Sequence, residues 1–260
     1  MFGLTIKPRP WNFAVFGKHP AAGDFITLGD SSPLLLGFSS WMDQGFSRLS
    51  GESKLRKGFC WRFWARGPNS KLILGLVKSS QDCHGRIYPL MVVGEGKNPE
   101  DMDANWDLFP LYCEKTWMDL YRYTGKRISA VKDLKRTLGK IKGPLSSIRD
   151  HHEKREAIRA IELSHQRRRT GYSSEFMNRM NNVEGLSRMD MFSIRIDVGQ
   201  RGDCHVPVMK LLALLKNRTK KEPGTVFIGG RGNNNRMLVL KRSLLADDFA
   251  RLWAAMDEED

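Results

Sequence analysis

The residues best placed for chemistry lie in a turn-rich string near the N-terminus, Gly17–Phe25 (GKHPAAGDF). Its Gly-Lys pair is part of the phosphate-loop pattern, which also needs a glycine five positions earlier and a hydroxyl residue after the lysine. Asn12 and His19 occupy those two positions, so the pattern fails at both ends. His19 and Asp24 could act as base and acid, but the string offers neither a nucleophile nor a metal partner. We therefore predict a structural turn, with Asp24 bonding backbone amides and His19 either packed or exposed.

The tripeptide Asp-Cys-His occurs twice, at 82–84 and at 203–205. Two thiols and two imidazoles could form a zinc site, but adjacent Cys and His side chains point in different directions and the sequence has no CxxC pair. Nothing indicates a lowered thiol pKa, so a cysteine nucleophile is not predicted either. We predict no enzyme, no cofactor and no metal. A hydrolase built around His19, Asp24 and the two tripeptides is the competing hypothesis.

A second glycine-rich string, Gly229–Asn235 (GGRGNNN), is followed by an apolar run typical of a strand. Rossmann loops hold pyrophosphate at a helix N-terminus, so this string does not predict dinucleotide binding. Glycine and asparagine tolerate positive φ, and the string therefore predicts a hairpin turn.

The charge balance raises the question of a nucleic-acid or anionic-surface partner. The chain has 43 Lys and Arg against 29 Asp and Glu, a net charge of +14. Between Lys126 and Thr170, fourteen basic residues accompany five acidic ones, but no Trp, Tyr or Phe is available to stack on bases. We interpret this segment as a solvated helical face, with Arg167, Arg168 and Arg169 as a patch for an acidic protein partner. Nucleic-acid binding through the segment is the alternative.

Apolar patterning predicts an α/β or α+β fold, with a central sheet of antiparallel hairpins flanked by helices. We treat 1–260 as a single domain and 125–190 as a basic, mainly helical elaboration within it. Strands are expected at 11–16, 58–65, 71–78, 86–93, 191–198, 225–229 and 236–240, and helices at 34–49, 99–123, 206–217 and 243–253.

Individual residues predict where several of these elements begin and end. Ser32 and Pro33 suit the start of the first helix, and 67–70 (GPNS) suits a hairpin turn. Pro89 predicts an edge strand or a bulge, Pro110 a kinked or divided helix, and Ser243 the cap of the last helix. The longest apolar runs fall far short of the roughly 20 residues of a transmembrane helix, and the start of the chain lacks a signal-peptide pattern. We therefore expect a cytoplasmic protein without membrane insertion.

The string Phe16–Phe25 (FGKHPAAGDF) resembles the opening signature of the TagF (ImpM) family of type VI secretion accessory proteins. That signature is a hydrophobic residue, Gly-Lys-x-Pro, and then Gly-Asp-Phe. The resemblance continues in family order, is strongest over 11–93, is weaker near the C-terminus and leaves 125–200 unmatched. The residues that carry its continuation are Trp41, Trp61, Arg62, Phe63, Asp82, Gly85, Arg86, Tyr88, Pro89 and Leu90.

This resemblance implies a bacterial, cytoplasmic, non-enzymatic protein that represses assembly of the type VI secretion system after translation. It also implies binding to a forkhead-associated scaffold protein, alongside a threonine phosphatase of the same pathway. In the alternative interpretation the turn residues have only structural roles, with Phe25 anchored in the core. The candidate partner-binding residues are Gly17, Lys18, His19, Pro20, Gly23, Asp24, Phe25 and Arg86.

Overall fold

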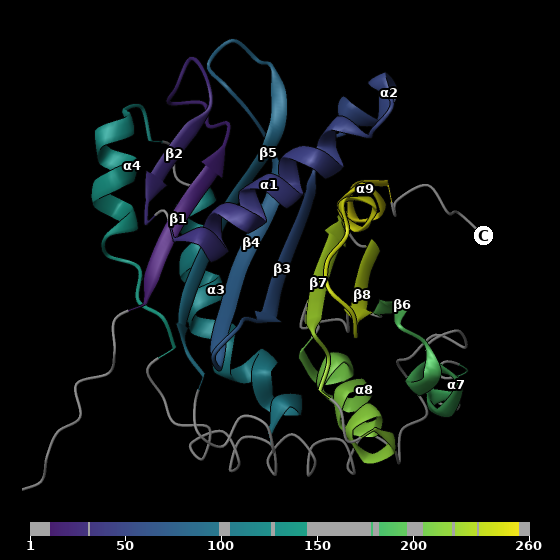
Figure 1. Ribbon diagram of the computed structural model, residues 1–260. Coiled ribbons are helices and arrows are strands. Elements are labelled where there is room, and N and C mark those ends of the chain that lie inside the picture. Colours follow the sequence, from purple (N-terminus) through teal and green to yellow (C-terminus); the bar gives the residue numbers. More distant parts are fainter. Residues whose placement is uncertain are drawn as a thin grey trace, which may run out of the picture.

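The computed structural model describes residues 11–30, 32–98, 105–125, 128–144, 178, 182–196, 205–219, 222–232 and 234–254. They form an eight-stranded sheet in the order β2-β1-β5-β4-β3-β7-β8-β6, with helices on both faces (Figure 1). Every pair of neighbouring strands is antiparallel. The predicted sheet of antiparallel hairpins flanked by helices is confirmed, and the antiparallel pairing makes α+β the better of the two descriptions.

The elements lie close to where the apolar pattern predicts them. Among the strands the exception is β2, a four-residue strand that directly follows the turn-rich string and that the pattern does not predict. The short helices at Gly51–Lys54 and Val183–Arg188 are not predicted either. The strands are β1 (Asn12–Gly17), β2 (Ile26–Gly29), β3 (Phe59–Arg66), β4 (Lys71–Gln81), β5 (Ile87–Lys97), β6 (Met191–Ile196), β7 (Thr225–Arg231) and β8 (Asn234–Leu240). The helices are α1 (Pro33–Ser47), α2 (Gly51–Lys54), the 3-10 turn η1 (Trp106–Leu108), α3 (Phe109–Gly125), α4 (Val131–Leu138), α7 (Val183–Arg188), α8 (His205–Arg218) and α9 (Ala246–Ala254).

The two faces of the sheet bury separate halves of the core. Successive side chains of a strand point to opposite faces, and β3 shows this clearly. Trp61 and Phe63 join the apolar cluster beneath α1 and α9, whereas Trp64 joins the cluster beneath α3, α4 and α8. On that second face the Trp64 ring stacks on Phe109 of α3, with 5.4 Å between centroids. Figure 1 shows α1 and α9 crossing one face and α3 lying behind the sheet.

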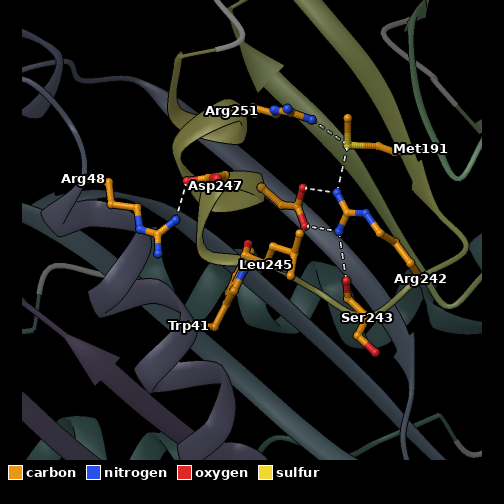
Figure 2. A network of polar contacts seen from close by, with 9 residues as sticks. Trp41, Arg48, Met191, Arg242, Ser243, Leu245, Asp247 and Arg251 are labelled. Atoms are coloured by element: carbon orange, nitrogen blue, oxygen red, sulfur yellow. Dashed lines mark hydrogen bonds and ion pairs between the residues drawn. The ribbon is translucent and has the colours of Figure 1, made fainter.

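Polar contacts fasten α9 to α1 across their shared face of the sheet (Figure 2). The indole nitrogen of Trp41 donates a 2.8 Å hydrogen bond to the Leu245 carbonyl. Arg48 pairs with Asp247 at 2.6 Å on the exposed side. Within the α9 segment, both terminal nitrogens of Arg242 lie 2.7 Å from the buried carboxylate of Asp248. The C-terminal helix is therefore fixed to the N-terminal half of the chain.

The starts of the first and last helices differ in how well the sequence predicts them. Ser32 caps α1, because its hydroxyl accepts a hydrogen bond from the Leu35 amide at 3.3 Å. The Ser243 prediction is wrong, since α9 begins at Ala246. There the Leu245 amide donates a 2.8 Å hydrogen bond to the carboxylate of Asp248, the third residue of the helix. The third helical residue makes the same interaction in a capping box.

Pro89 does not place β5 at an edge, and that prediction is wrong. β5 lies between β1 and β4 in the sheet. The N–H and C=O of one strand residue point to the same side, and the Pro89 carbonyl accepts a 3.2 Å hydrogen bond from the Lys18 amide on the β1 side. β1 has already ended at Gly17. Proline has no amide hydrogen to donate toward β1. Because β1 ends before it reaches Pro89, the sheet loses no β1–β5 hydrogen bond there.

The predicted helix over 99–123 is divided, as Pro110 predicts. Residues 99–104 lie outside the described part of the chain, η1 covers Trp106–Leu108, and α3 begins at Phe109. Pro110 is thus the second residue of α3, where a helix does not use the amide that proline lacks. Among the described residues, no helix is both long and apolar enough to cross a membrane.

The beginning of the predicted basic elaboration belongs to the core. α4 buries Leu134 and Leu138 in the same cluster as α3 and contacts β2. Its basic residues Lys132, Lys135 and Arg136 are exposed. Most of 145–181, including Arg167, Arg168 and Arg169, lies outside the described residues, and the prediction of a basic patch stands there untested.

Candidate functional site: two joined loops at one end of the sheet

The turn-rich string lies beside the loop that carries the first Asp-Cys-His tripeptide. Residues 18–25 connect β1 to β2, and 82–86 connect β4 to β5. Because β1 pairs with β5 and β5 pairs with β4, both loops lie at the same end of the sheet, at the top of Figure 1. A backbone hydrogen bond of 2.9 Å from the Cys83 amide to the Ala22 carbonyl joins them directly.

A buried carboxylate, Asp82, holds the two loops together. It accepts hydrogen bonds from Lys18 Nζ at 2.9 Å, from Arg86 Nε at 2.7 Å, and from the amides of His84 and Arg86 at 3.0 and 2.9 Å. Burial alone would raise the pKa of Asp82, but the hydrogen bonds from Lys18 and from the Arg86 and His84 groups outweigh it and hold the pKa well below its ordinary range. Lys18 is itself only 6% exposed, so this is a buried, charged pair.

Gly17 is required by the backbone at the point where β1 ends. Its φ is +112°, a value that side-chain-bearing residues rarely adopt, and a Cβ there would lie 1.9 Å from the Pro89 carbonyl oxygen. Gly23 is different, because a Cβ at that position would meet the His84 imidazole at an ordinary 3.4 Å. The turn-shaping interpretation thus holds firmly for Gly17. Gly23 and Pro20 are exposed on the loop surface.

Phe25 does not anchor the turn in the core, and that expectation is wrong. Its side chain is 57% exposed, while the next residue, Ile26, is buried and starts β2. The Phe25 ring packs edge-on against Tyr88, with 4.7 Å between centroids, and Lys18 Nζ lies 4.9 Å from its centroid. The aromatic ring is therefore held in one place on the surface, with much of it open to solvent.

Asp24 and His19 have the structural roles predicted from the sequence. Asp24 Oδ1 accepts a 2.9 Å hydrogen bond from the Phe25 amide. His19 is buried, and its Nδ1 accepts a 3.0 Å hydrogen bond from the Ala21 amide. Burial, together with the positive charge of Lys78, lowers the pKa of His19 and favours the neutral ring. With Nδ1 accepting, the neutral ring carries its proton on Nε2.

Two cysteines outside the Asp-Cys-His tripeptides are poor candidates for a nucleophile. Burial raises the pKa of Cys60 to about 11 and raises that of the fully buried Cys113 as well, which suppresses the nucleophilic thiolate. Within the described ranges, no cluster of three or more His, Cys, Asp or Glu side chains could hold a metal ion. Asp203 and Cys204 of the second tripeptide lie outside those ranges.

Arg86 connects the buried pair to the surface. Its Nε contacts Asp82, while its Nη2 donates to the Gly23 carbonyl and lies 3.9 Å from Asp24 Oδ1. The side chain is nevertheless 54% exposed. We call the exposed residues of the two loops the Phe25 surface. It consists of Pro20, Gly23, Asp24, Phe25, Cys83, His84, Gly85 and Arg86.

The structure brings together most of the residues that the sequence singled out, but sequence reasoning missed how they are joined. It treats Asp82 only as part of a tripeptide and of the resemblance. The spacing of Asp82 to Gly85 and Arg86 is a usable signal, because an aspartate that precedes a Gly-containing turn commonly bonds the amides that follow it. Asp82 pairs with Lys18, which is 64 residues away in the sequence, so no local pattern predicts this ion pair.

A comparison with family models matches the part of the chain that contains both loops. Residues 14–139 match the TagF N-terminal domain, Type VI secretion system-associated. The chain belongs to this family through that domain and is a type VI secretion system-associated protein. The match runs well past residue 93 and includes α4, so the expectation that the whole of 125–200 is unmatched is wrong for 125–139.

A solved structure is similar over nearly the whole chain. PA0076 from Pseudomonas aeruginosa PAO1 superposes with a TM-score of 0.53 over 95% of this chain and 96% of that chain, at 14% sequence identity. At this identity the likeness supports the fold alone. No curated protein matches the sequence.

Proposed function

We propose that this chain is a non-enzymatic, cytoplasmic regulator that represses type VI secretion system assembly after translation, by binding a scaffold protein such as a forkhead-associated component. Membership of the TagF family supports the link to the secretion system. The observation that carries the binding step is Phe25, which is 57% exposed and yet held by Tyr88 and Lys18. A threonine phosphatase of the same pathway is a further expected partner.

The Phe25 surface has the physical properties of a protein-binding site. Aromatic and arginine side chains contribute most of the binding energy at interfaces, and Phe25 and Arg86 provide one of each. The ion pairs of Asp82 and the joining hydrogen bonds fix the loops before any partner arrives. Little conformational entropy is then lost on binding, which favours affinity.

Replacing Phe25 by alanine tests the binding step. Because the ring is exposed, Phe25→Ala should leave the fold intact and weaken scaffold binding by about 2 kcal/mol or more, roughly thirtyfold in Kd. Tyr121→Ala removes an aromatic ring of nearly equal exposure, 58%, from α3 and is the matched control. Titration calorimetry with the purified forkhead-associated protein measures both. Equal affinity of the two variants would contradict a role for Phe25.

A secretion assay tests repression in the cell. Deleting the gene should raise type VI secretion under conditions that repress it, the wild-type chain and Tyr121→Ala should restore repression, and Phe25→Ala should not. Unchanged secretion in the deletion strain would rule out a repressor, whatever the protein binds in vitro.

A further inference from the structure

A cavity of about 520 Å³ lies beside the Phe25 surface and plays no part in the function proposed above. It is bounded by the start of the β1–β2 loop, the end of β4, Lys57 just before β3, the last two residues of α3, and residues 128–129. Binding sites for small molecules usually have volumes of about 300–1,000 Å³, so the cavity can hold a ligand larger than a simple ion.

The lining of this cavity is basic and rich in hydrogen-bond donors. It includes Lys57, Lys78, His19, Ser79, Ser80 and Ser129, and none of the described lining residues is Asp or Glu. Partly or fully buried lysines elsewhere in the structure differ in their partners. Lys18, Lys71 and Lys216 each pair with a carboxylate, whereas Lys54 and Lys241 donate to backbone carbonyls. The cavity is lined by an exposed lysine, Lys57, and a half-buried one, Lys78, without a described acidic residue beside them.

The two cavity lysines keep their charge available. Lys57 Nζ donates a 3.3 Å hydrogen bond to the neutral Gln81 side chain, and within the described ranges neither Lys57 nor Lys78 has a carboxylate partner at ion-pair distance. Lys78 is half-buried, where a charge is screened less than at the open surface. An anion in the cavity would therefore supply the counter-charge that the chain does not.

Neutral hydrogen-bond donors also line the cavity that contains the two lysines. His19 Nδ1 is occupied by the Ala21 amide, so the ring presents an Nε2–H. The Ser79 hydroxyl accepts a hydrogen bond from the Gly58 amide at 2.7 Å and keeps its own proton to donate. The carboxyl end of α3, at Thr124 and Gly125, carries about half a negative charge and repels an anion. The two positive charges of the lysines outweigh this repulsion.

We propose that this cavity binds a phosphate group carried as a monoester or as the free ion. A phosphate dianion matches two lysines in charge, and its several oxygens can accept from the imidazole and the serine hydroxyls at once. A carboxylate matches less well, since it has a single charge and two oxygens. The site does not depend on repression or on scaffold binding, and either can fail without the other.

Titration calorimetry on the full chain at low ionic strength tests the site, with inorganic phosphate and a phosphoserine peptide as probes. Both should bind, and acetate and the unphosphorylated peptide should bind at least about tenfold more weakly. Lys78→Met and Lys57→Met should each weaken phosphate binding about tenfold or more, as loss of a charge-assisted hydrogen bond does. Lys135→Met, which removes an exposed charge of α4 outside the cavity, should leave it unchanged.

Nuclear magnetic resonance locates the site independently. Phosphate should shift the His19 imidazole resonances of the wild-type chain, identified by their loss in His19→Gln. Tighter binding of the phosphopeptide than of inorganic phosphate would assign the ligand to a phosphorylated protein, and the reverse to a free phosphate compound. Absence of phosphate binding, equal binding of acetate, or equal affinities of Lys78→Met and Lys135→Met would overturn the proposal.

Discussion

At the scale of single residues, Asp82 determines how the site is built. A buried carboxylate is costly unless its charge is compensated and its oxygens are hydrogen-bonded. Lys18 and Arg86 provide the compensation, and the backbone amides of the same loop provide the remaining donors. Lys18 also lies over the Phe25 ring, so the carboxylate positions the exposed aromatic through its lysine partner.

The pKa of Asp82 predicts a specific loss of stability in acid. A carboxyl whose pKa is lower in the folded than in the unfolded state stabilises the protein above the unfolded value, about 3.9, and loses that contribution as the pH falls below it. Urea unfolding of the wild-type chain should therefore show stability falling below about pH 4. Asp82→Asn should be less stable at pH 7, because it leaves Lys18 buried without its counter-charge, and should show a shallower decline in acid.

Asp133→Asn is the control for that measurement, since Asp133 pairs with Arg136 at the exposed surface of α4. Its acid profile should follow the wild-type curve. A decline for Asp82→Asn as steep as that of the wild type would show that the lowered pKa of Asp82 is not what destabilises the protein in acid.

At the scale of elements, the close approach of α1 and α9 depends on one glycine. Gly45 lies on the buried face of α1, and a Cβ there would come within 2.3 Å of the Phe249 Cβ and 2.6 Å of the Ala246 carbonyl oxygen. Both contacts belong to α9, and one of them is backbone. Together with the Trp41–Leu245 hydrogen bond, this close packing sets the position of the last helix.

Replacing each of two glycines of α1 by alanine should therefore change the free energy of unfolding in opposite directions. Gly45→Ala should lower the free energy of unfolding by about 1–3 kcal/mol, because overpacking against α9 outweighs the better helix propensity of alanine. Gly37→Ala should raise it by about 0.5–1 kcal/mol, since nothing lies within 4 Å of a Cβ there. Chemical denaturation of both variants measures the contrast. Stabilisation by Gly45→Ala would show that α9 can move away without cost.

At the scale of the whole molecule, the part that matches the family model is not a closed structural unit. Residues 14–139 contain most of β1, all of β2–β5 and α1–α4, but β3 pairs with β7 over seven positions. α9 covers the same face, where the indole nitrogen of Trp61 donates to the Leu252 carbonyl at 3.0 Å. Trp253 in turn donates to the Ser53 carbonyl at 2.7 Å. The C-terminal strands and helix complete the sheet and the core that the N-terminal part begins.

This arrangement predicts that the chain behaves as one domain. A fragment ending at residue 144 would leave the apolar edge of β3 unpaired and Trp61 uncovered, so it should aggregate or bind a hydrophobic dye. The full chain should unfold in a single cooperative transition. Circular dichroism, dye binding and gel filtration compare the two. A soluble fragment that unfolds cooperatively would show that the N-terminal part is a domain by itself.

The sequence by itself was enough to locate most elements, because their signals are local. Apolar patterns placed every strand except β2 as well as α1, and Ser32 marked a helix start. Residues 67–70 marked a hairpin turn that the structure closes with Asn69 and Ser70 at positive φ. The string Phe16–Phe25 was enough to indicate the family, which the match over 14–139 confirms. Each of these signals lies within a few residues of the feature that it predicts.

Only the tertiary structure decided what the loops do. The order of the strands, the interior position of β5 and the pairing of Lys18 with Asp82 all join segments far apart in the chain. An aromatic residue next to a strand can face the core or the solvent, and the sequence left both roles open for Phe25. The cavity beside the Phe25 surface collects residues from four separate segments. Such sites arise from packing, which no local pattern specifies.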